Sequence, residues 1–409
     1  MTAMLELNAA REILLAHAPA PGRALVPLAE AGGRVLAEAV HADRAIPDCD
    51  RAIMDGYAMR SADLGPEGGE LVCVGEIRAG DAWTTLIQPG MCVAIMTGAA
   101  VPPGADAVVK VEQTRSGSAP GTVVFQSGAS PGQDIMPRGQ DAAKGVVLLE
   151  PGTVLGPAAC GLLALCGLTQ VPVWAQPSVA ALSTGNEIVA PEATPTAYQT
   201  RDANTAIISA MLRRHGFERP ADLGIARDDP NDLRRAIAAG LGHDLLLLSG
   251  GVSMGVSDIV PDILAELGIA RLFAGVAVKP GKPLWAGLRP DRPVVLAMPG
   301  NPLAVLVHSS EMVVPLLRKM SGHPTPGPPL VPAILTADVL THTDRITAQP
   351  SRIAVAESAT GPCLQATPLR MHGSADLAGA AQANGLIFLP AGRQLWGSGT
   401  EVQARVWWL

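Results

Sequence analysis

The clearest evidence for the fold lies in residues 244–255, which read Asp-Leu-Leu-Leu-Leu-Ser-Gly-Gly-Val-Ser-Met-Gly. An uninterrupted apolar run such as these leucines is typical of a strand that is buried on both faces, as in a parallel sheet. The loop that follows contains three glycines and two serines, and a helix is predicted directly after it, over Ile259–Leu267. A buried strand, a glycine-rich loop and a helix in this order predict one unit of an α/β sheet.

The same alternation extends from residue 177 to residue 320. The predicted strands are Val179–Leu182, Asp222–Ile225, Asp244–Leu248, Leu272–Val278 and Val294–Ala297. The predicted helices are Asn204–His215, Asn231–Ala239, Ile259–Leu267 and Leu303–Met320. Short strands that alternate with helices of about ten residues predict βαβ units and a parallel, doubly wound α/β sheet domain, assigned to residues 177–323.

Three further domains are expected around this α/β domain. Residues 45–145 contain short β-like runs between turns and no clear helix, which predicts a β-rich insert domain. Residues 1–44 and 146–176 flank the insert and are expected to form a linking domain of helices and strands, whose dimerisation role is implied only by a family resemblance. Its first helix is expected to present Leu5, Ala9, Ile13 and His17 on one face. The proline-rich segment Pro324–Pro332 predicts a boundary, after which residues 333–409 form a separately folding C-terminal β-barrel domain.

Composition excludes several classes of protein. The 409 residues carry a net charge of −7 and 48% of them are hydrophobic, which excludes an intrinsically disordered chain. This charge supplies no basic field for a polyanion, so nucleic acid is not an expected partner. The six cysteines form no CxxC pair, which favours mostly buried thiols in a reducing compartment. The eight histidines form no HExxH or HxxxH pair, so a zinc site has little support.

No targeting or membrane segment is expected. Glu6, Arg11 and Glu12 interrupt any apolar stretch of a signal peptide. Residues 151–186 carry no charge, but prolines break them, and their helical piece is far shorter than the ~20 residues that a membrane span needs. The sequence therefore predicts a soluble, cytoplasmic protein without a membrane partner.

Polar residues follow each predicted strand of the α/β domain, and in such sheets ligands bind beyond the carboxyl ends of the strands. The glycine-rich loop predicts an anion site, because glycines admit a close approach to the backbone and the next helix offers free N–H groups. A plain glycine-rich turn is the alternative, and a solvated turn is the alternative for the two lysines. The predicted substrate-binding residues in these loops are Ser249, Gly250, Gly251, Ser253, Gly255, Lys279, Lys282, Pro299, Gly300, Asn301 and Pro302.

Glu187, Asp228 and Asp258 form an acidic set at three of these strand ends. Carboxylates near a phosphate site typically hold Mg²⁺, which takes oxygen ligands and bridges to substrate phosphates. The alternative for Asp228 is a helix N-cap before Pro230, and for Asp258 a helix-start acid that matches the helix dipole. In the β-rich insert, Asp55, Thr97 and Asp141 each lie beside a glycine, and the two acids are typical of turn caps.

The chain resembles the MoeA family of molybdopterin molybdenumtransferases, which includes the E domain of gephyrin. The motifs that carry this resemblance run nearly from end to end: MDGYA at 54–58, IMTGA at 95–99, GQDIMPRGQD at 132–141, STGNE at 183–187, DAN at 202–204, SGGVSMGVSD at 249–258, KPGKP at 279–283, PGNP at 299–302 and ANGLIFLP at 383–390. Departures from the family pattern occur at 48–53, at Asp344-Arg345 and at His372-Gly373-Ser374, and these leave a paralogue or scaffold with altered activity as an alternative.

The resemblance implies a homodimer of four-domain subunits, with an active cleft between the α/β domain and the β-rich domain of the partner subunit. It implies that Asp55, Thr97, Asp141, Glu187, Asp228 and Asp258 are catalytic. The implied reaction inserts molybdenum from molybdate into adenylylated molybdopterin and releases AMP with Mg²⁺, which Glu187, Asp228 and Asp258 would hold. Lys279 and Lys282 suit the oxyanion, with Arg345 and Ser374 as further contributors.

Transient contacts with the molybdopterin adenylyltransferase and with downstream molybdoenzyme factors are also implied by the resemblance. Three other classes share part of this pattern. A molybdopterin adenylyltransferase has the α/β domain but lacks the insert and the barrel, and a nicotinamide-nucleotide hydrolase lacks the MDGYA motif. A purely structural scaffold would not need the acids and lysines that this sequence retains.

Overall fold

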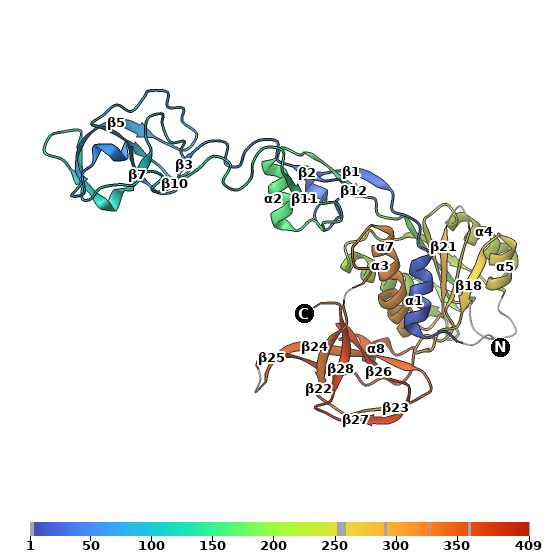
Figure 1. Ribbon diagram of the computed structural model, residues 1–409. Helices are drawn as coiled ribbons and strands as arrows, with labels where there is room; N and C mark the ends of the chain where they lie inside the picture. The colour runs from blue at the N-terminus through green and yellow to red at the C-terminus, as the bar shows by residue number, and fades with distance from the viewer. Residues whose placement is uncertain (1–3, 252–258, 290–292, 328, 359–360, 409) are drawn as a thin grey trace. The chain divides into compact units, whose positions relative to one another are not determined.

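The computed structural model describes residues 4–251, 259–289, 293–327, 329–358 and 361–408, and the chain divides into two compact units (Figure 1). The first unit comprises Met1–Ala24, Gly33–Val35 and Val173–Leu409, and it contains the α/β layers and the C-terminal barrel. The second unit comprises Leu25–Gly32 and Leu36–Pro172. The predicted residues Ser253, Gly255 and Asp258 lie outside the described residues.

The first unit has a central sheet whose parallel core is as predicted. Its strand order is β16 (Ala221–Ala226), β13 (Val179–Thr184), β17 (Leu245–Ser249), β21 (Val294–Met298), β20 (Trp285–Leu288) and β18 (Ala270–Ala274). The first four strands are parallel, whereas β20 runs antiparallel to both β21 and β18. All residues of β17 and β21 are buried, as expected for strands covered on both faces.

The strand predicted over Leu272–Val278 is two elements, and this part of the prediction is wrong. The main-sheet strand β18 ends at Ala274, and β19 (Val278–Lys279) pairs instead with a strand of the barrel. The strand β20 was not predicted either, because its sequence, Trp-Ala-Gly-Leu, includes a glycine, which weakens a strand interior. The chain therefore leaves the sheet, makes the 279–283 loop and returns antiparallel.

Helices cover both faces of the sheet, which confirms the doubly wound architecture (Figure 1). On one face, α4 (Pro230–Gly240) and α5 (Val260–Glu266) pack Leu233 and Ile263 against Leu246 and Val295. On the other face lie α1 (Leu7–Ala16), α3 (Asn204–Arg214), α6 (Pro302–His308) and α7 (Val314–Met320). A π-helical segment, Ser309–Val313, joins α6 to α7, so the helix predicted over Leu303–Met320 is continuous but irregular.

The buried face of α1 differs from the prediction. Leu7, Ala10 and Leu14 are the buried residues of this helix, whereas His17 is exposed and its Nδ1 lies 2.8 Å from the carbonyl oxygen of Ile13. Apolar residues occupy two adjacent stripes of this helix, and the sequence pattern alone does not distinguish which of them faces the sheet.

The C-terminal part of the first unit is a closed β-barrel, as predicted. Its strands are β22 (Val331–Leu335), β24 (Ile346–Ser358), β25 (Gly361–Pro368), β26 (Gly385–Leu389) and β28 (Glu401–Val406), and the pairing of β24 with β26 closes it. The antiparallel pair of β23 (Val339–Thr343) and β27 (Gly392–Trp396) and the short helix α8 (Leu377–Ala380) were not predicted. The predicted linker also ends earlier, because Pro332 already pairs within β22.

The barrel shares a hydrophobic core with the α/β layers. Leu386, Phe388 and Trp407 belong to the same buried cluster as Leu296 of the central sheet and Leu316 of α7. A buried carboxylate reinforces this junction: Glu311 in the π-helical segment accepts hydrogen bonds from Arg405 of β28, at 2.9 and 2.8 Å, and from Arg11 of α1, at 3.1 Å. This shared core contradicts the expectation that residues 333–409 fold separately.

The second unit is built on a curled sheet, which confirms the β-rich insert. The strand order is β7 (Ala107–Lys110), β4 (Gly56–Met59), β6 (Met91–Ile95), β5 (Gly69–Ile77), β9 (Thr122–Phe125) and β8 (Thr114–Ser116). Short pairs join β3 (Arg51–Ala52) to β10 (Ile135–Met136) and β2 (Val40–His41) to β11 (Val147–Leu149). The unit also contains α2 (Pro157–Leu165), and the chain passes between the units along β1 (Arg23–Pro27) and β12 (Gln170–Trp174).

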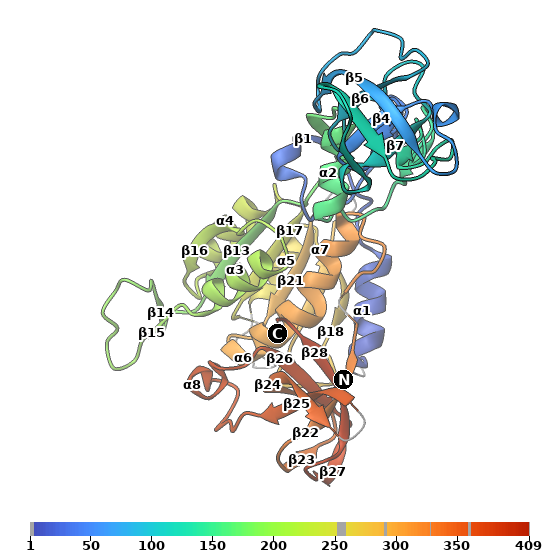
Figure 2. The same cartoon turned by 90° about the vertical axis from the view of Figure 1, so that its left-hand side faces the viewer.

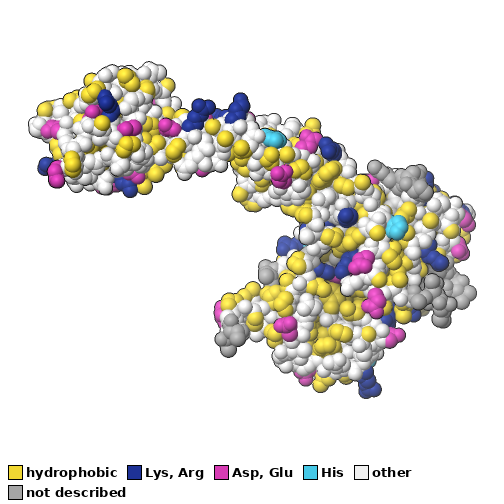
Figure 3. Space-filling view, viewed as in Figure 1, with side chains coloured by type: hydrophobic (Ala, Val, Ile, Leu, Met, Phe, Trp, Pro, Cys, Tyr) yellow, Lys and Arg dark blue, Asp and Glu magenta, His cyan; other side chains and the backbone are white. Residues whose placement is uncertain are grey.

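Two observations bear on partners. Within the described ranges, no helix has the length and apolar character needed to cross a membrane. On the face drawn in Figure 3, acidic and basic side chains are interspersed and form no large field of one sign.

Candidate active site

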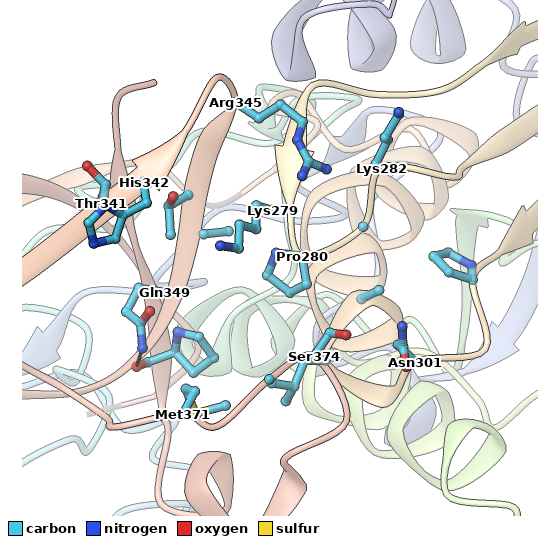
Figure 4. Close-up of a pocket in the computed structure, with 18 of the residues that line it drawn as sticks. Lys279, Pro280, Lys282, Asn301, Thr341, His342, Arg345, Gln349, Met371 and Ser374 are labelled. Carbon is cyan, nitrogen blue, oxygen red and sulfur yellow. Dashed lines mark hydrogen bonds between the residues drawn. The ribbon is translucent and has the colours of Figure 1, made fainter. Parts of the chain in front are cut away.

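A cavity of about 600 Å³ lies in the first unit between the 279–283 loop, the start of α6 and the barrel. It brings together all four residues predicted for the oxyanion, Lys279, Lys282, Arg345 and Ser374, and it also includes Pro299 and Asn301 from the predicted substrate-binding set. Figure 4 shows Arg345, Lys279 and Lys282 on one side of the view and Ser374 and Asn301 on the other. We call this cavity the cationic pocket, because the side chains of Lys279, Lys282 and Arg345 line it.

The two lysines are held by an internally bonded loop. The carbonyl oxygen of Lys282 accepts the backbone N–H groups of Val276, at 2.9 Å, and of Leu284, at 3.0 Å. Gly281 has a φ of +118°, a region that L side chains rarely adopt. Lys279 enters the loop from β19, which pairs with Thr347 of β24, so one strand pairing connects the lysines to the barrel.

Arg345 is fixed against the same strand pairing. Its Nη1 donates to the carbonyl oxygen of Val278 at 3.3 Å, and its Nε lies 3.5 Å from Asp344. In the view of Figure 4 its guanidinium group lies between the side chains of Lys279 and Lys282. A guanidinium presents five N–H donors in a planar fork, so one bond to the backbone leaves further donors for an oxyanion.

A second cavity, of about 450 Å³, lies at the carboxyl ends of β13 and β17, and we call it the strand-end pocket. Of the predicted residues, Glu187, Ser249, Gly300, Asn301 and Pro302 line it, and Asn301 lines both pockets. Gly250 and Gly251, which follow β17, have φ values of +98° and +64°. A Cβ atom at Gly250 would lie 2.4 Å from the carbonyl oxygen of Thr184, so only glycine fits there.

The main polar network of the strand-end pocket was not predicted as a site. One carboxylate oxygen of Asp202 accepts the hydroxyls of Ser183, at 2.8 Å, and Thr205, at 2.7 Å, and the Ser183 hydroxyl lies 3.0 Å from that of Ser249. Asn204 is buried and donates to the carbonyl oxygen of Gly300 at 2.9 Å, while its Oδ1 has no partner among the described residues. Asp202 lies two residues before α3 and Asn204 is its first residue, so the rule applied to the main-sheet strands did not select them, although the DAN motif includes both.

The predicted metal ligands are only partly placed. Glu187 and Asp228 are exposed, and Asp228 exchanges two long hydrogen bonds with Asn186, at 3.4 and 3.2 Å. The N-cap of α4 is Asp229, whose carboxylate accepts two backbone N–H groups at 3.0 Å, so the N-cap alternative for Asp228 is wrong. The described residues form no group of three His, Cys, Asp or Glu side chains that could hold a metal ion.

In the second unit, Asp55 and Thr97 form a close pair. One carboxylate oxygen of Asp55 accepts both the backbone N–H and the hydroxyl of Thr97, each at 2.7 Å. The Asp55 carboxylate therefore binds Thr97, which lies 42 positions further along the chain, and does not cap its own turn. These two hydrogen bonds, the backbone one first, hold the pKa of Asp55 below its usual value. Asp141 is exposed, and its backbone N–H donates to the carbonyl oxygen of Ile46 at 2.9 Å.

Replacing Thr97 by Val should raise the pKa of Asp55 toward its usual value, because the hydroxyl donor is lost while the backbone donor stays. The pKa in the folded state is the lowered one, so this pair stabilises the fold above the unfolded pKa and stops doing so as pH falls through the folded pKa. A carbon-detected NMR titration of the Asp55 carboxyl would measure the shift, with Thr114→Val in the same unit as the control. An unchanged Asp55 pKa would contradict the assigned hydrogen bond.

An α/β sheet with glycines at a strand end, beside a pocket lined by cations, is the arrangement typical of proteins that bind anionic ligands at the carboxyl edge of a sheet. Comparison with known proteins makes this class specific. Residues 5–167 match the MoeA N-terminal region (domain I and II), residues 180–319 a probable molybdopterin binding domain, and residues 332–407 the MoeA C-terminal region (domain IV).

Curated relatives and solved structures point to the same family as these matches. A Nostoc protein named molybdopterin molybdenumtransferase is 34% identical over 92% of this chain and 87% of its own length. Molybdopterin molybdenumtransferase 2 of Mycobacterium tuberculosis is 34% identical over 93% of this chain and 94% of its own. The molybdopterin biosynthesis MoeA protein of Pyrococcus horikoshii, a crystal structure, matches with a TM-score of 0.82 at 28% identity, over 99% of both chains. The chain belongs to the MoeA family of molybdopterin molybdenumtransferases, which are transferases of molybdenum cofactor biosynthesis.

Proposed function

We propose that this chain transfers molybdenum from molybdate to adenylylated molybdopterin and releases AMP in a Mg²⁺-dependent step. The observation that carries the proposal is the cationic pocket, where Lys279, Lys282 and Arg345 line one cavity with Ser374. Molybdate is a tetrahedral dianion, and charge-assisted hydrogen bonds from ammonium and guanidinium groups are the strong contacts for such an ion. Ser374 adds a hydroxyl from the barrel side.

The strand-end pocket supports a place for the organic substrate beside this oxyanion. It offers hydroxyl, amide and carboxylate groups from Ser183, Asn204 and Asp202, and the unpartnered Oδ1 of Asn204 is an acceptor with no protein donor among the described residues. A buried polar group without a partner is costly, so a bound donor group would satisfy it. Asn301 lines both cavities, which would place the two substrates next to one another.

The proposed metal ligands have the chemistry that Mg²⁺ prefers. Glu187 and Asp228 supply only oxygen atoms, follow the adjacent strands β13 and β16, and are exposed to solvent. These residues, with Asp258 as the third member expected from sequence, would hold the ion, which supplies charge neutralisation at the phosphates of the substrate when it is bound. The chain's own cations and the positive-φ glycines would orient the phosphates for the cleavage that releases AMP.

The homodimer expected from the family remains a proposal, in which the Asp55–Thr97 pair and Asp141 of one subunit complete the site of another. A mixed dimer of Asp55→Asn and Asp258→Asn subunits, each inactive alone, should recover part of the activity. Purified heterodimers with no activity above either parent would contradict a shared site. Transient contacts with the adenylyltransferase and with molybdoenzyme factors belong to the same proposal.

The direct test is to incubate the protein with adenylyl-molybdopterin, Mg²⁺ and molybdate and to measure AMP by chromatography and molybdenum bound to the pterin by mass spectrometry. AMP should appear only when molybdate and Mg²⁺ are both present. AMP release without molybdenum on the product would indicate a hydrolase, and no release at all would favour a scaffold or a paralogue with altered activity.

Replacing Asp258 by Asn should sharply reduce AMP release while folding stays nearly unchanged, because the substitution keeps the size of the side chain and removes its charge. A carboxylate close to a phosphate repels it unless a cation lies between them. The competing role is a helix-start acid that contributes roughly 0.3–1 kcal/mol to stability. Mg²⁺-dependent turnover and thermal unfolding, measured side by side, separate the two: lost stability with normal turnover would leave the metal role without support.

A further inference from the structure

His308 is a buried side chain that contacts the loop of the cationic pocket. It is the last residue of α6 and is fully buried, and its Nε2 lies 2.7 Å from the carbonyl oxygen of Gly281. A Cβ atom at Gly281 would lie 2.6 Å from Nε2 and 3.0 Å from Cε1 of the ring. The ring therefore packs directly on the point of the loop between Lys279 and Lys282 where φ is positive.

The direction of this hydrogen bond is fixed by its partner. A carbonyl oxygen can only accept, so Nε2 carries the proton and donates it to Gly281. Burial lowers the pKa of His308 to about 4, so the ring is neutral at neutral pH and has a single N–H. Its Nδ1 is then an acceptor, and it is buried with no partner within the described residues. An apolar residue would avoid this unsatisfied atom, so packing alone does not account for a histidine here.

The segment that follows His308 connects to the barrel, other residues of which line the cationic pocket. The helix widens into the π-helical segment directly after His308, and such widened turns occur frequently at functional sites. Within that segment, Glu311 binds Arg405 of the barrel. Four consecutive residues therefore contact both the lysine loop, through His308, and the barrel that carries Arg345, through Glu311.

We propose that His308 is a positioning residue for the oxyanion: its hydrogen bond to Gly281 fixes the loop so that Lys279 and Lys282 stay in the cavity with Arg345. This inference rests on the proposed function, since it assigns the lysines to molybdate. His308 itself does not line the cavity, so it acts through the loop and makes no contact with substrate.

The test uses the full-length chain and three variants. His308→Met fills the buried space and removes the donor, and His308→Gln keeps an N–H donor of similar reach. Ser309→Ala is the matched control, because the adjacent Ser309 hydroxyl is buried and has no hydrogen-bond partner in the described part of the chain. Molybdate alone is the probe for calorimetric binding. With the adenylylated substrate, KM for molybdate and kcat are measured separately, and hydrogen exchange is followed at the backbone N–H groups of Val276 and Leu284.

We expect His308→Met to weaken molybdate binding and raise its KM roughly tenfold, as for loss of one hydrogen bond, with a smaller change in kcat. Exchange at Val276 and Leu284 should accelerate. His308→Gln should restore both properties most of the way, and Ser309→Ala should match the wild type. Unchanged exchange in His308→Met, or equal losses in the Met and Gln variants, would overturn the inference.

Two further outcomes are informative. If His308→Met does not fold, Gly281→Ala takes its place, because the added Cβ would push the loop off the ring, and normal molybdate binding by that variant would overturn the inference. If the wild-type chain binds no molybdate, the proposed function fails. The exchange rates at Val276 and Leu284 then still decide whether His308 fixes the loop.

Discussion

The Arg405→Met variant should unfold at a markedly lower temperature than the wild type, with a loss of about 3–5 kcal/mol in the free energy of unfolding. The side chains of Arg405 and Glu311 are 6% and 1% exposed, and two hydrogen bonds join them. Without Arg405, the Glu311 carboxylate stays buried with Arg11, the hydroxyl of Ser310 and no second guanidinium. The penalty arises from desolvating a charge that has lost its main partner.

An exposed ion pair provides the control. Arg234 and Glu266 are 40% and 56% exposed, so Arg234→Met should cost at most about 1 kcal/mol. Adding Glu311→Gln to Arg405→Met should recover part of the loss, since it removes a buried charge that has lost its main partner. Chemical denaturation of the four proteins measures these differences. Equal costs for Arg405→Met and Arg234→Met would contradict a buried charge pair at the junction with the barrel.

The Arg345→Met variant should bind molybdate about 10–100-fold more weakly, with a stability close to that of the wild type. A hydrogen bond to a charged group contributes about 1.5–3 kcal/mol, which corresponds to this range of affinity. Arg345→Lys should lose less, because it keeps the charge but not the planar fork. Unfolding should change little, because the side-chain contacts that are lost are a 3.3 Å hydrogen bond to Val278 and a 3.5 Å ion pair with the exposed Asp344.

Arg352→Met is the matched control, because Arg352 lies on β24, the strand that begins directly after Arg345, and is exposed outside the cationic pocket. Titration calorimetry with molybdate, repeated at two salt concentrations, measures the effect. If both arginine variants lost affinity equally, the effect would come from the overall charge of the protein, and Arg345 would have no specific place in the oxyanion site.

The sequence allowed the parallel core of the sheet to be predicted, because the leucine run of β17 and the apolar run of β21 carry a signal that depends only on local residues. The antiparallel strand β20 and the β23–β27 pair were not predicted, because their pairing partners decide that they are strands. The core-facing side of α1 was predicted only in part: Leu5 and Ile13 pack against the core, but the buried residues of the helix are Leu7, Ala10 and Leu14.

The same difference between local and long-range signals applies to the candidate site. Lys279 and Lys282 follow an apolar run and precede a proline-rich turn, so their position could be predicted from spacing. Asp202, Asn204 and His308 could not be selected by such rules, because their importance lies in contacts with Ser183, Gly300 and Gly281, residues 19, 96 and 27 positions away. A histidine inside an apolar helix has no local feature that distinguishes a loop anchor from a packed side chain.

The contact of Arg11, Glu311 and Arg405 has a consequence for synthesis on the ribosome. Arg11 and Arg405 are separated by 405 − 11 = 394 positions, yet both bind one carboxylate. At about 5–20 residues per second, α1 would wait roughly 20–80 s for the strand that completes its surroundings. Residues Leu36–Pro172, by contrast, form an almost continuous unit that emerges early. We therefore expect the second unit to mature first during translation, whereas the first unit can complete its contacts around Glu311 only after β28 has been synthesised.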